Sequence, residues 1–157
     1  MRSQEKPLRD TALDALARRE HSHFELTKKL LAKGYDANEV EAELSSLVRE
    51  GVLDDLRFAE AYAHHRARRG YGRFRLVAEL KERGVSAEVI GSALDTADFD
   101  WASIIEDTWR KKFGSLPANF QESAKQARFL EYRGFPSDSI KQLFRRLQDQ
   151  AKAEELL

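Results

Sequence analysis

The stretch Leu30-Leu-Ala-Lys-Gly34-Tyr35 recurs as Leu80-Lys-Glu-Arg-Gly84-Val85 and as Leu130-Glu-Tyr-Arg-Gly134-Phe135. The three glycines are spaced evenly by 50 residues, and each follows an apolar run of helical periodicity. A glycine at this position adopts the left-handed backbone that ends a helix. The resulting Schellman turn brings the leucine into contact with the apolar residue after the glycine. This pattern predicts three copies of one unit, although three unrelated helices that all end in glycine would also produce it.

Helical periodicity continues on both sides of each glycine turn. Val40, Leu44, Leu47 and Val48 predict one inward stripe. Asp54, a capping acid, and Phe58, an inward aromatic residue, mark the start of the second unit. No stretch alternates long enough to predict a strand. The chain is therefore predicted to be all-α, with three tandem three-helix repeats that share apolar surface and form an elongated, curved body.

The helix starts and ends also predict the domain boundaries. Asp36 and Asp100 are placed to cap helices, and the first helix is expected from about Asp10 to Glu20. The predicted segments are a flexible lead at residues 1–8, repeats at 9–52, 53–97 and 98–150, and a C-terminal tail at 151–157. The residues that define the repeats are Leu30, Gly34, Asp54, Phe58, Leu80, Gly84, Leu130 and Gly134.

Composition excludes several classes of protein. The 157 residues contain no cysteine, so neither a thiolate nucleophile nor a cysteine zinc site is possible. The sequence has no phosphate-binding loop, no serine in a nucleophile elbow, and no apolar run of membrane-spanning or signal-peptide type. The histidine pairs His21/His23 and His64/His65 do not form a ligand set. We expect no catalysis, metal or cofactor; an enzyme of unrecognised type is a distant alternative.

The 27 basic and 27 acidic side chains cancel, which argues against a protein that binds polyanions over its whole surface. The basic residues are nevertheless clustered. Arginines at 66–75 offer planar guanidinium groups suited to carboxylates or phosphates, and Tyr71 could stack on a base or enter a protein pocket. A second basic group lies at 110–112, with Arg145 and Arg146 further on. The alternative is that these charges are solvated helix faces. The candidate binding residues are Arg66, Arg68, Arg69, Tyr71, Arg73, Arg75, Arg110, Lys111 and Lys112.

Two segments resemble the RecX family, regulators of the RecA recombinase. The first is Asp54-Asp55-Leu56-Arg57-Phe58-Ala59, followed by Arg66, Gly72, Arg73 and the turn at Gly84. The second is Leu13-Asp-Ala-Leu16-Ala-Arg18-Arg19, followed by Ser22, Glu25, Leu26 and the turn at Gly34. The third unit is similar only loosely, because its long turn with Pro117 matches no family pattern. The resemblance covers about residues 10–148.

The resemblance implies tandem three-helix units and a non-catalytic role in homologous recombination and the SOS response. A protein of this family is expected to bind the RecA filament on single-stranded DNA, in the filament groove, and mostly to inhibit ATP hydrolysis, strand exchange and co-protease activity. We therefore expect a cytoplasmic monomer with RecA as its partner, indirect or weak contact with single-stranded DNA, and no membrane contact. The alternative is a direct DNA-binding protein, since three-helix units can resemble helix-turn-helix modules.

Overall fold

The computed structural model describes residues 6–157, and its regular elements in that range are all α-helices. Residues 1–5 of the predicted lead lie outside the described part of the chain. The all-α prediction is confirmed, while the repeat boundaries and the elongated shape stay predictions. The nine helices are α1 (Leu8–Arg18), α2 (His23–Ala32), α3 (Ala37–Arg49), α4 (Asp55–Arg68), α5 (Arg73–Glu82), α6 (Ala87–Thr96), α7 (Trp101–Lys112), α8 (Phe120–Tyr132) and α9 (Ser137–Glu155).

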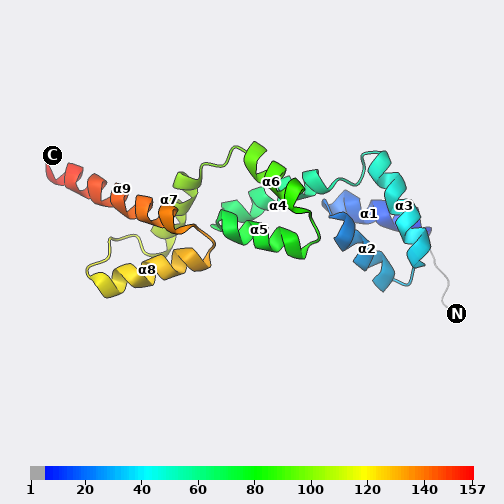
Figure 1. The fold of residues 1–157 in the computed structure, drawn as a ribbon, viewed down its shortest axis with the longest axis horizontal. Helices are drawn as coiled ribbons and strands as arrows, with labels where there is room; N and C mark the ends of the chain where they lie inside the picture. The colour runs from blue at the N-terminus through cyan, green and yellow to red at the C-terminus, as the bar shows by residue number, and fades with distance from the viewer. Residues whose placement is uncertain (1–5) are drawn as a thin grey trace. The chain divides into compact units, whose positions relative to one another are not determined.

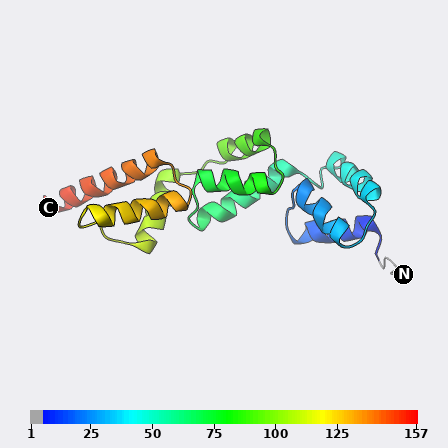
Figure 2. The ribbon, with the colours of Figure 1, turned by 60° about the horizontal axis from the view of Figure 1, so that its bottom comes forward.

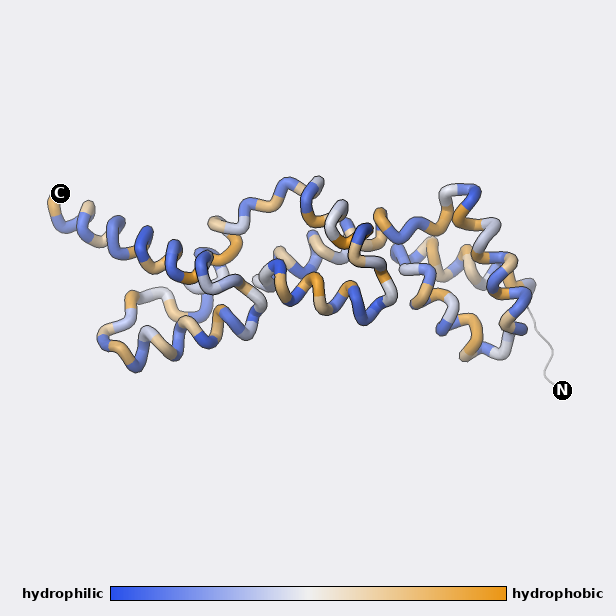
Figure 3. The backbone as a smooth tube through the Cα atoms, viewed as in Figure 1, coloured by the Kyte–Doolittle hydropathy of each residue, from blue (hydrophilic) through white to orange (hydrophobic). Residues whose placement is uncertain are grey.

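The chain forms two compact units. The first runs to Tyr62 and includes Glu79–Ala97, and the second comprises Ala63–Ala78 and Asp98–Leu157, so that α4 and α5 each contribute to both. In the first unit, α1, α2 and α3 lie together (Figure 1). Their core is built from leucines, alanines and a valine. In the second unit, α7, α8 and α9 lie together (Figure 2). Their core contains Trp109 and Phe135. The last turns of α9 alternate between hydrophilic residues and alanines (Figure 3).

The three glycine turns have the predicted hydrogen bonds. All three glycines have positive φ angles, 98° at Gly34, 79° at Gly84 and 98° at Gly134. In each turn the N–H of the residue after the glycine donates to the carbonyl oxygen of the leucine four residues before the glycine. These bonds are Tyr35 to Leu30 at 3.3 Å, Val85 to Leu80 at 3.1 Å and Phe135 to Leu130 at 3.1 Å. The leucines are fully buried. The shared sequence motif thus encodes one Schellman turn three times.

Side-chain caps set the starts of most helices. Asp36, Asp54 and Asp100 accept backbone N–H groups at the starts of α3, α4 and α7, as predicted. The complete capping box lies at the start of α2, where Ser22 accepts from Glu25 N–H and the Glu25 carboxylate accepts from Ser22 N–H. Ser22 and Glu25 entered the sequence analysis only through the family resemblance, and this capping box was not predicted.

Two details of the sequence prediction are wrong. Helix α1 begins at Leu8 and ends at Arg18, about two residues before the expected bounds at each end. Val48 was expected in the core but is 48% exposed, whereas Leu53 is 1% exposed. The cause is the turn at Gly51, where φ is +78° and the Leu53 N–H donates to the Leu47 carbonyl oxygen. This turn folds Leu53 back onto the core, so the apolar stripe of α3 continues through Leu53 rather than through Val48.

His21 is buried just before α2, with 1% of its surface exposed. Its Nδ1 lies 3.1 Å from the Arg19 carbonyl oxygen, and its Nε2 lies 3.4 Å from the Lys29 ammonium. In the neutral tautomer that these partners favour, Nδ1–H donates to Arg19 and Nε2 accepts from Lys29. Burial lowers the pKa of His21 because it disfavours the charged imidazolium, and the Lys29 charge acts in the same direction.

The lowered pKa of His21 predicts a loss of stability in mild acid. Above the pH range in which an unfolded histidine titrates, near 6.5, both states are neutral and the stability is fully present. As the pH falls from 6.5 towards the lower folded-state pKa, the unfolded chain takes up the proton first, so the free energy of unfolding decreases. Urea unfolding at several pH values between 7 and 5, followed by circular dichroism, measures how the free energy of unfolding depends on pH. This dependence should be weaker in His21→Asn than in the wild-type protein. Equal dependence in the two proteins would show that His21 does not cause the loss of stability.

Candidate partner-binding surface

The turn between α4 and α5 is anchored by backbone hydrogen bonds to the end of α8. Gly72 N–H donates to the Arg133 carbonyl oxygen at 2.8 Å, and Phe74 N–H donates to the Gly134 carbonyl oxygen at 3.0 Å. The turn at residues 69–72, which joins the arginine-bearing ends of α4 and α5, is therefore not a free loop. Its backbone is held in place by the glycine turn that ends α8.

Tyr71 lies at the centre of a group of arginines. The guanidinium carbons of Arg66, Arg133 and Arg75 lie 3.8, 4.6 and 5.1 Å from the centre of its ring. Each distance falls within the range of a cation–π contact. Arg75 also donates to the Tyr132 carbonyl oxygen at 3.1 Å. The ring of Tyr71 is thus packed against side chains of its own chain, and in this arrangement it orients arginines instead of presenting an open stacking platform.

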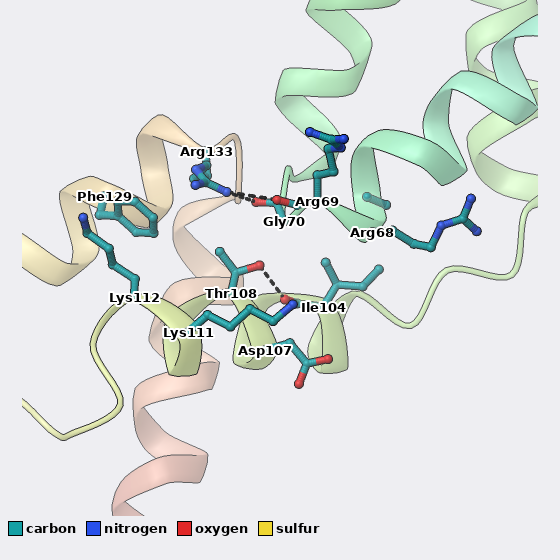
Figure 4. Close-up of a pocket in the computed structure, with 11 residues that line it drawn as sticks. Arg68, Arg69, Gly70, Ile104, Asp107, Thr108, Lys111, Lys112, Phe129 and Arg133 are labelled. Atoms are coloured by element: carbon teal, nitrogen blue, oxygen red, sulfur yellow. Dashed lines mark hydrogen bonds between the residues drawn. The ribbon is translucent and has the colours of Figure 1, made fainter.

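Arg133 connects the Tyr71 group to a neighbouring pocket. Its Nη1 donates to the carbonyl oxygens of Arg69 at 3.2 Å and Gly70 at 3.1 Å, and its guanidinium lies 4.9 Å from the ring centre of Phe129 (Figure 4). Sequence reasoning used Arg133 only as part of the glycine motif. A basic residue precedes the glycine in all three copies of that motif, which is the signal that could have drawn attention to it.

The pocket lies within the second unit, where the end of α4 meets α7 and α8. Its volume is about 380 Å³. Figure 4 shows its lining side chains, with the Arg69–Gly70 segment and Arg133 joined by hydrogen bonds and Thr108 bonded to the Ile104 carbonyl oxygen. The lining residues are Ala67, Arg68, Arg69, Gly70, Ile104, Asp107, Thr108, Lys111, Lys112, Phe129 and Arg133.

The pocket has a strong excess of positive charge. Five of its lining residues are basic and one, Asp107, is acidic. Arg68, Arg69, Lys111 and Lys112 are exposed. Within residues 6–157, none of these four side chains forms an ion pair with a carboxylate. Their charge is therefore available to an anionic partner and is weakened only by solvent and salt.

The other predicted residues lie in different surroundings. Arg110 forms an ion pair with Glu106 one turn earlier in α7 and is absent from the pocket lining. Arg146 donates to the Ala102 carbonyl oxygen, and Arg145 is exposed. Arg73 is half-buried at the start of α5. The second predicted basic group is thus divided, because only Lys111 and Lys112 join Arg68 and Arg69 at one site.

Comparison with known proteins gives the family. Models of the first, second and third three-helix domains of RecX match residues 9–47, 54–94 and 101–144. The chain belongs to the RecX family. Named relatives include "Regulatory protein RecX" of Pseudomonas fluorescens, 47% identical over 137 residues that cover 87% of this chain and 88% of the relative, and that of Pseudomonas putida GB-1, 42% identical with the same coverage. Like these RecX relatives, this chain is a regulatory protein and not an enzyme.

Solved RecX structures have the same fold. The crystal structure of RecX from Lactobacillus salivarius superimposes with a TM-score of 0.74 at 15% identity, covering 90% of this chain and 94% of that one. A second RecX crystal structure gives a TM-score of 0.70 at 18% identity, covering 87% and 72%. At these identities the comparison establishes the fold alone. Among residues 6–157, no helix combines the length and apolar character needed to cross a bilayer.

Proposed function

We propose that this protein binds the RecA filament on single-stranded DNA, in the filament groove, and reduces ATP hydrolysis, strand exchange and co-protease activity by RecA. The observation that carries the proposal is the match of all three RecX domain models along the chain. The cluster of cations around Arg68 and Lys111 supports it, because a nucleoprotein filament presents phosphates and carboxylates. We further propose that the protein acts as a cytoplasmic monomer without metal or cofactor, and that the repeats extend over 9–52, 53–97 and 98–150.

The test is the DNA-dependent ATPase of RecA with purified protein added. ATP hydrolysis should fall at protein concentrations near or below that of RecA. An unchanged rate at excess protein would reject the proposed function. Electron microscopy of the same filaments reads out groove occupancy, and empty grooves together with a reduced ATPase would restrict the proposal to inhibition by another binding mode.

Reversing the exposed charges of the cluster should weaken the inhibition. In Arg68→Glu/Arg69→Glu, we expect about tenfold more protein to be needed for half-inhibition of the RecA ATPase, because two attractive contacts become repulsive. Arg66 is left unchanged, since it packs on Tyr71. The control is Lys141→Glu/Lys152→Glu on exposed positions of α9, which changes the net charge equally. Equal inhibition by the two variants would remove Arg68 and Arg69 from the proposed surface.

The alternative function is direct binding to DNA by the three-helix units. The positively charged pocket is the observation that favours it. If this alternative is correct, the protein should bind bare DNA with an affinity that falls steeply as the salt concentration rises. It differs from the main proposal in that the protein would bind DNA without changing the ATPase activity of RecA.

A further inference from the structure

We propose that the pocket lined by Arg68, Arg69, Lys111, Lys112, Arg133 and Phe129 binds a nucleotide unit of single-stranded nucleic acid. The proposal rests on the proposed function, because it assigns the contact with the DNA strand of the filament to one site on this chain. The pocket shares Arg133 with the Tyr71 group, but its lining also includes exposed cations such as Arg68 and Lys111.

The charge of the pocket fits phosphates better than a single carboxylate. Its lining carries five cations and one carboxylate, so four positive charges remain uncompensated. One carboxylate would neutralise only one of them. A nucleic acid strand brings a phosphate with every nucleotide, and its neighbouring phosphates can reach the exposed cations at the rim, which come from α7 and from the end of α4.

The size and walls of the pocket fit a base together with its phosphate. A volume of about 380 Å³ lies within the range of small-ligand sites and greatly exceeds the room that a carboxylate needs. The half-buried ring of Phe129 and the side chain of Ile104 supply apolar wall, and the guanidinium of Arg133 is held in place by the carbonyl oxygens of Arg69 and Gly70. Unpaired bases stack on aromatic rings, which makes Phe129 the stacking surface of this site. The Arg133 guanidinium, which lies 4.6 Å from the ring centre of Tyr71 and 4.9 Å from that of Phe129, supplies positive charge.

The pocket also favours a single strand over a duplex. A base can enter a concave site only when it is unpaired and turned out of its stack. A duplex offers only its backbone to the rim cations. Single-stranded DNA should therefore bind more tightly than duplex DNA of the same length.

The test is binding of a dye-labelled 15-nucleotide oligo(dT) to the intact protein, without RecA, measured by fluorescence anisotropy over a range of salt concentrations. Wild-type protein should bind, with log Kd depending linearly on log salt. In Lys111→Gln/Lys112→Gln the slope should be shallower by about 1.4, since each phosphate contact contributes about 0.7 for a single strand. At about 0.1 M salt this change corresponds to roughly 25-fold weaker binding. The control Lys141→Gln/Lys152→Gln should match wild type.

Competition experiments identify the ligand class. Unlabelled oligo(dT) should displace the probe at lower concentrations than a 15-base-pair duplex, thymidine triphosphate or a ten-residue glutamate peptide. No binding by wild type, or equal slopes in the two lysine variants, would overturn the proposal. A triphosphate that competes as well as the oligonucleotide would replace it with a free-nucleotide site, and a glutamate peptide that does so would replace it with a site for an acidic protein segment.

The RecA ATPase assay on the same proteins separates this proposal from the proposed function. Normal inhibition by a protein that does not bind oligo(dT) would reject the pocket and leave the function standing. Binding of oligo(dT) through the pocket without any effect on RecA would reject the function and leave the pocket standing.

Discussion

Replacing Gly134 with alanine is expected to lower the free energy of unfolding of the second unit by about 3 kcal/mol. Two costs combine at this position. The φ angle of +98° is unfavourable for any residue with a Cβ atom, at about 1–2 kcal/mol. The added Cβ would also lie 2.5 Å from the backbone nitrogen of Arg75 and in collision with the Arg75 Cβ, and such overpacking costs about 1–3 kcal/mol. The collision is with backbone, which cannot rotate away.

The measurement uses the fact that the second unit contains both tryptophans of the chain, Trp101 and Trp109. Urea unfolding followed by tryptophan fluorescence therefore reports this unit. The matched control is Gly114→Ala in the same unit, where φ is +75° but the nearest atom to an added Cβ, the Arg110 carbonyl oxygen, is 3.3 Å away. It should lose only about 1 kcal/mol, the backbone cost alone. Equal losses of unfolding free energy in Gly134→Ala and Gly114→Ala would show that the collision with Arg75 does not contribute to the destabilisation.

The same type of contact occurs in the first unit, at the glycine 50 residues earlier in the sequence. A Cβ atom added at Gly84 would collide with Phe24, as one at Gly134 would collide with Arg75. Ser22 Oγ donates to the Arg83 carbonyl oxygen at 2.7 Å, whereas Gly72 N–H donates to that of Arg133. The start of α2 therefore packs on the glycine turn that ends α5, and the start of α5 packs on the glycine turn that ends α8. Each of these glycines thus meets two requirements, a positive φ and a close approach.

Local features of the fold could be predicted from the sequence because they depend on neighbouring residues. The Schellman turns and the aspartate caps each involve residues within six positions of one another. The exchange of Val48 for Leu53 in the core could not be predicted, since it depends on the direction in which the chain leaves Gly51. The capping role of Asp55 at the start of α2 was not predicted, for a similar reason. Its carboxylate accepts from His23 N–H at 2.7 Å and so caps α2, which is 32 residues earlier in the chain.

The candidate site was predicted in composition but not in arrangement. Basic runs in the sequence nominate Arg68 and Lys111 as surface cations. They cannot show that these two residues line one pocket while Arg110 pairs with Glu106, because this outcome depends on how α7 packs on the end of α4. Arg133 was not predicted as a site residue, because its role depends on hydrogen bonds to the carbonyl oxygens of Arg69 and Gly70, which are more than 60 residues away in the sequence. The sequence gives the charge of each residue, but which charged residues lie together depends on the tertiary structure.

A buried hydrogen bond in the core of the second unit should be the other large contributor to its stability. Trp109 Nε1 donates to Gln126 Oε1 at 2.7 Å, and the two side chains are 2% and 6% exposed. Trp109→Phe should lower the free energy of unfolding by about 3 kcal/mol, because it removes apolar contact and leaves the amide oxygen of Gln126 without its donor. Gln126→Leu should cost about 2 kcal/mol by leaving the indole N–H unpaired.

The double variant Trp109→Phe/Gln126→Leu should lose at least 1 kcal/mol less than the sum of the two single losses, since neither buried partner is then left unpaired. Gln126 Nε2 also donates to the Ser115 carbonyl oxygen, but Ser115 is exposed and water can replace that bond. Thermal unfolding followed by circular dichroism measures all four proteins in the same way. The control cycle uses Trp101, which stacks on Phe99 and makes no hydrogen bond to Gln126. The losses of unfolding free energy in Trp101→Phe and Gln126→Leu should add to within about 0.5 kcal/mol. Equal coupling energies in the two cycles would show that the Trp109–Gln126 hydrogen bond does not stabilise the fold.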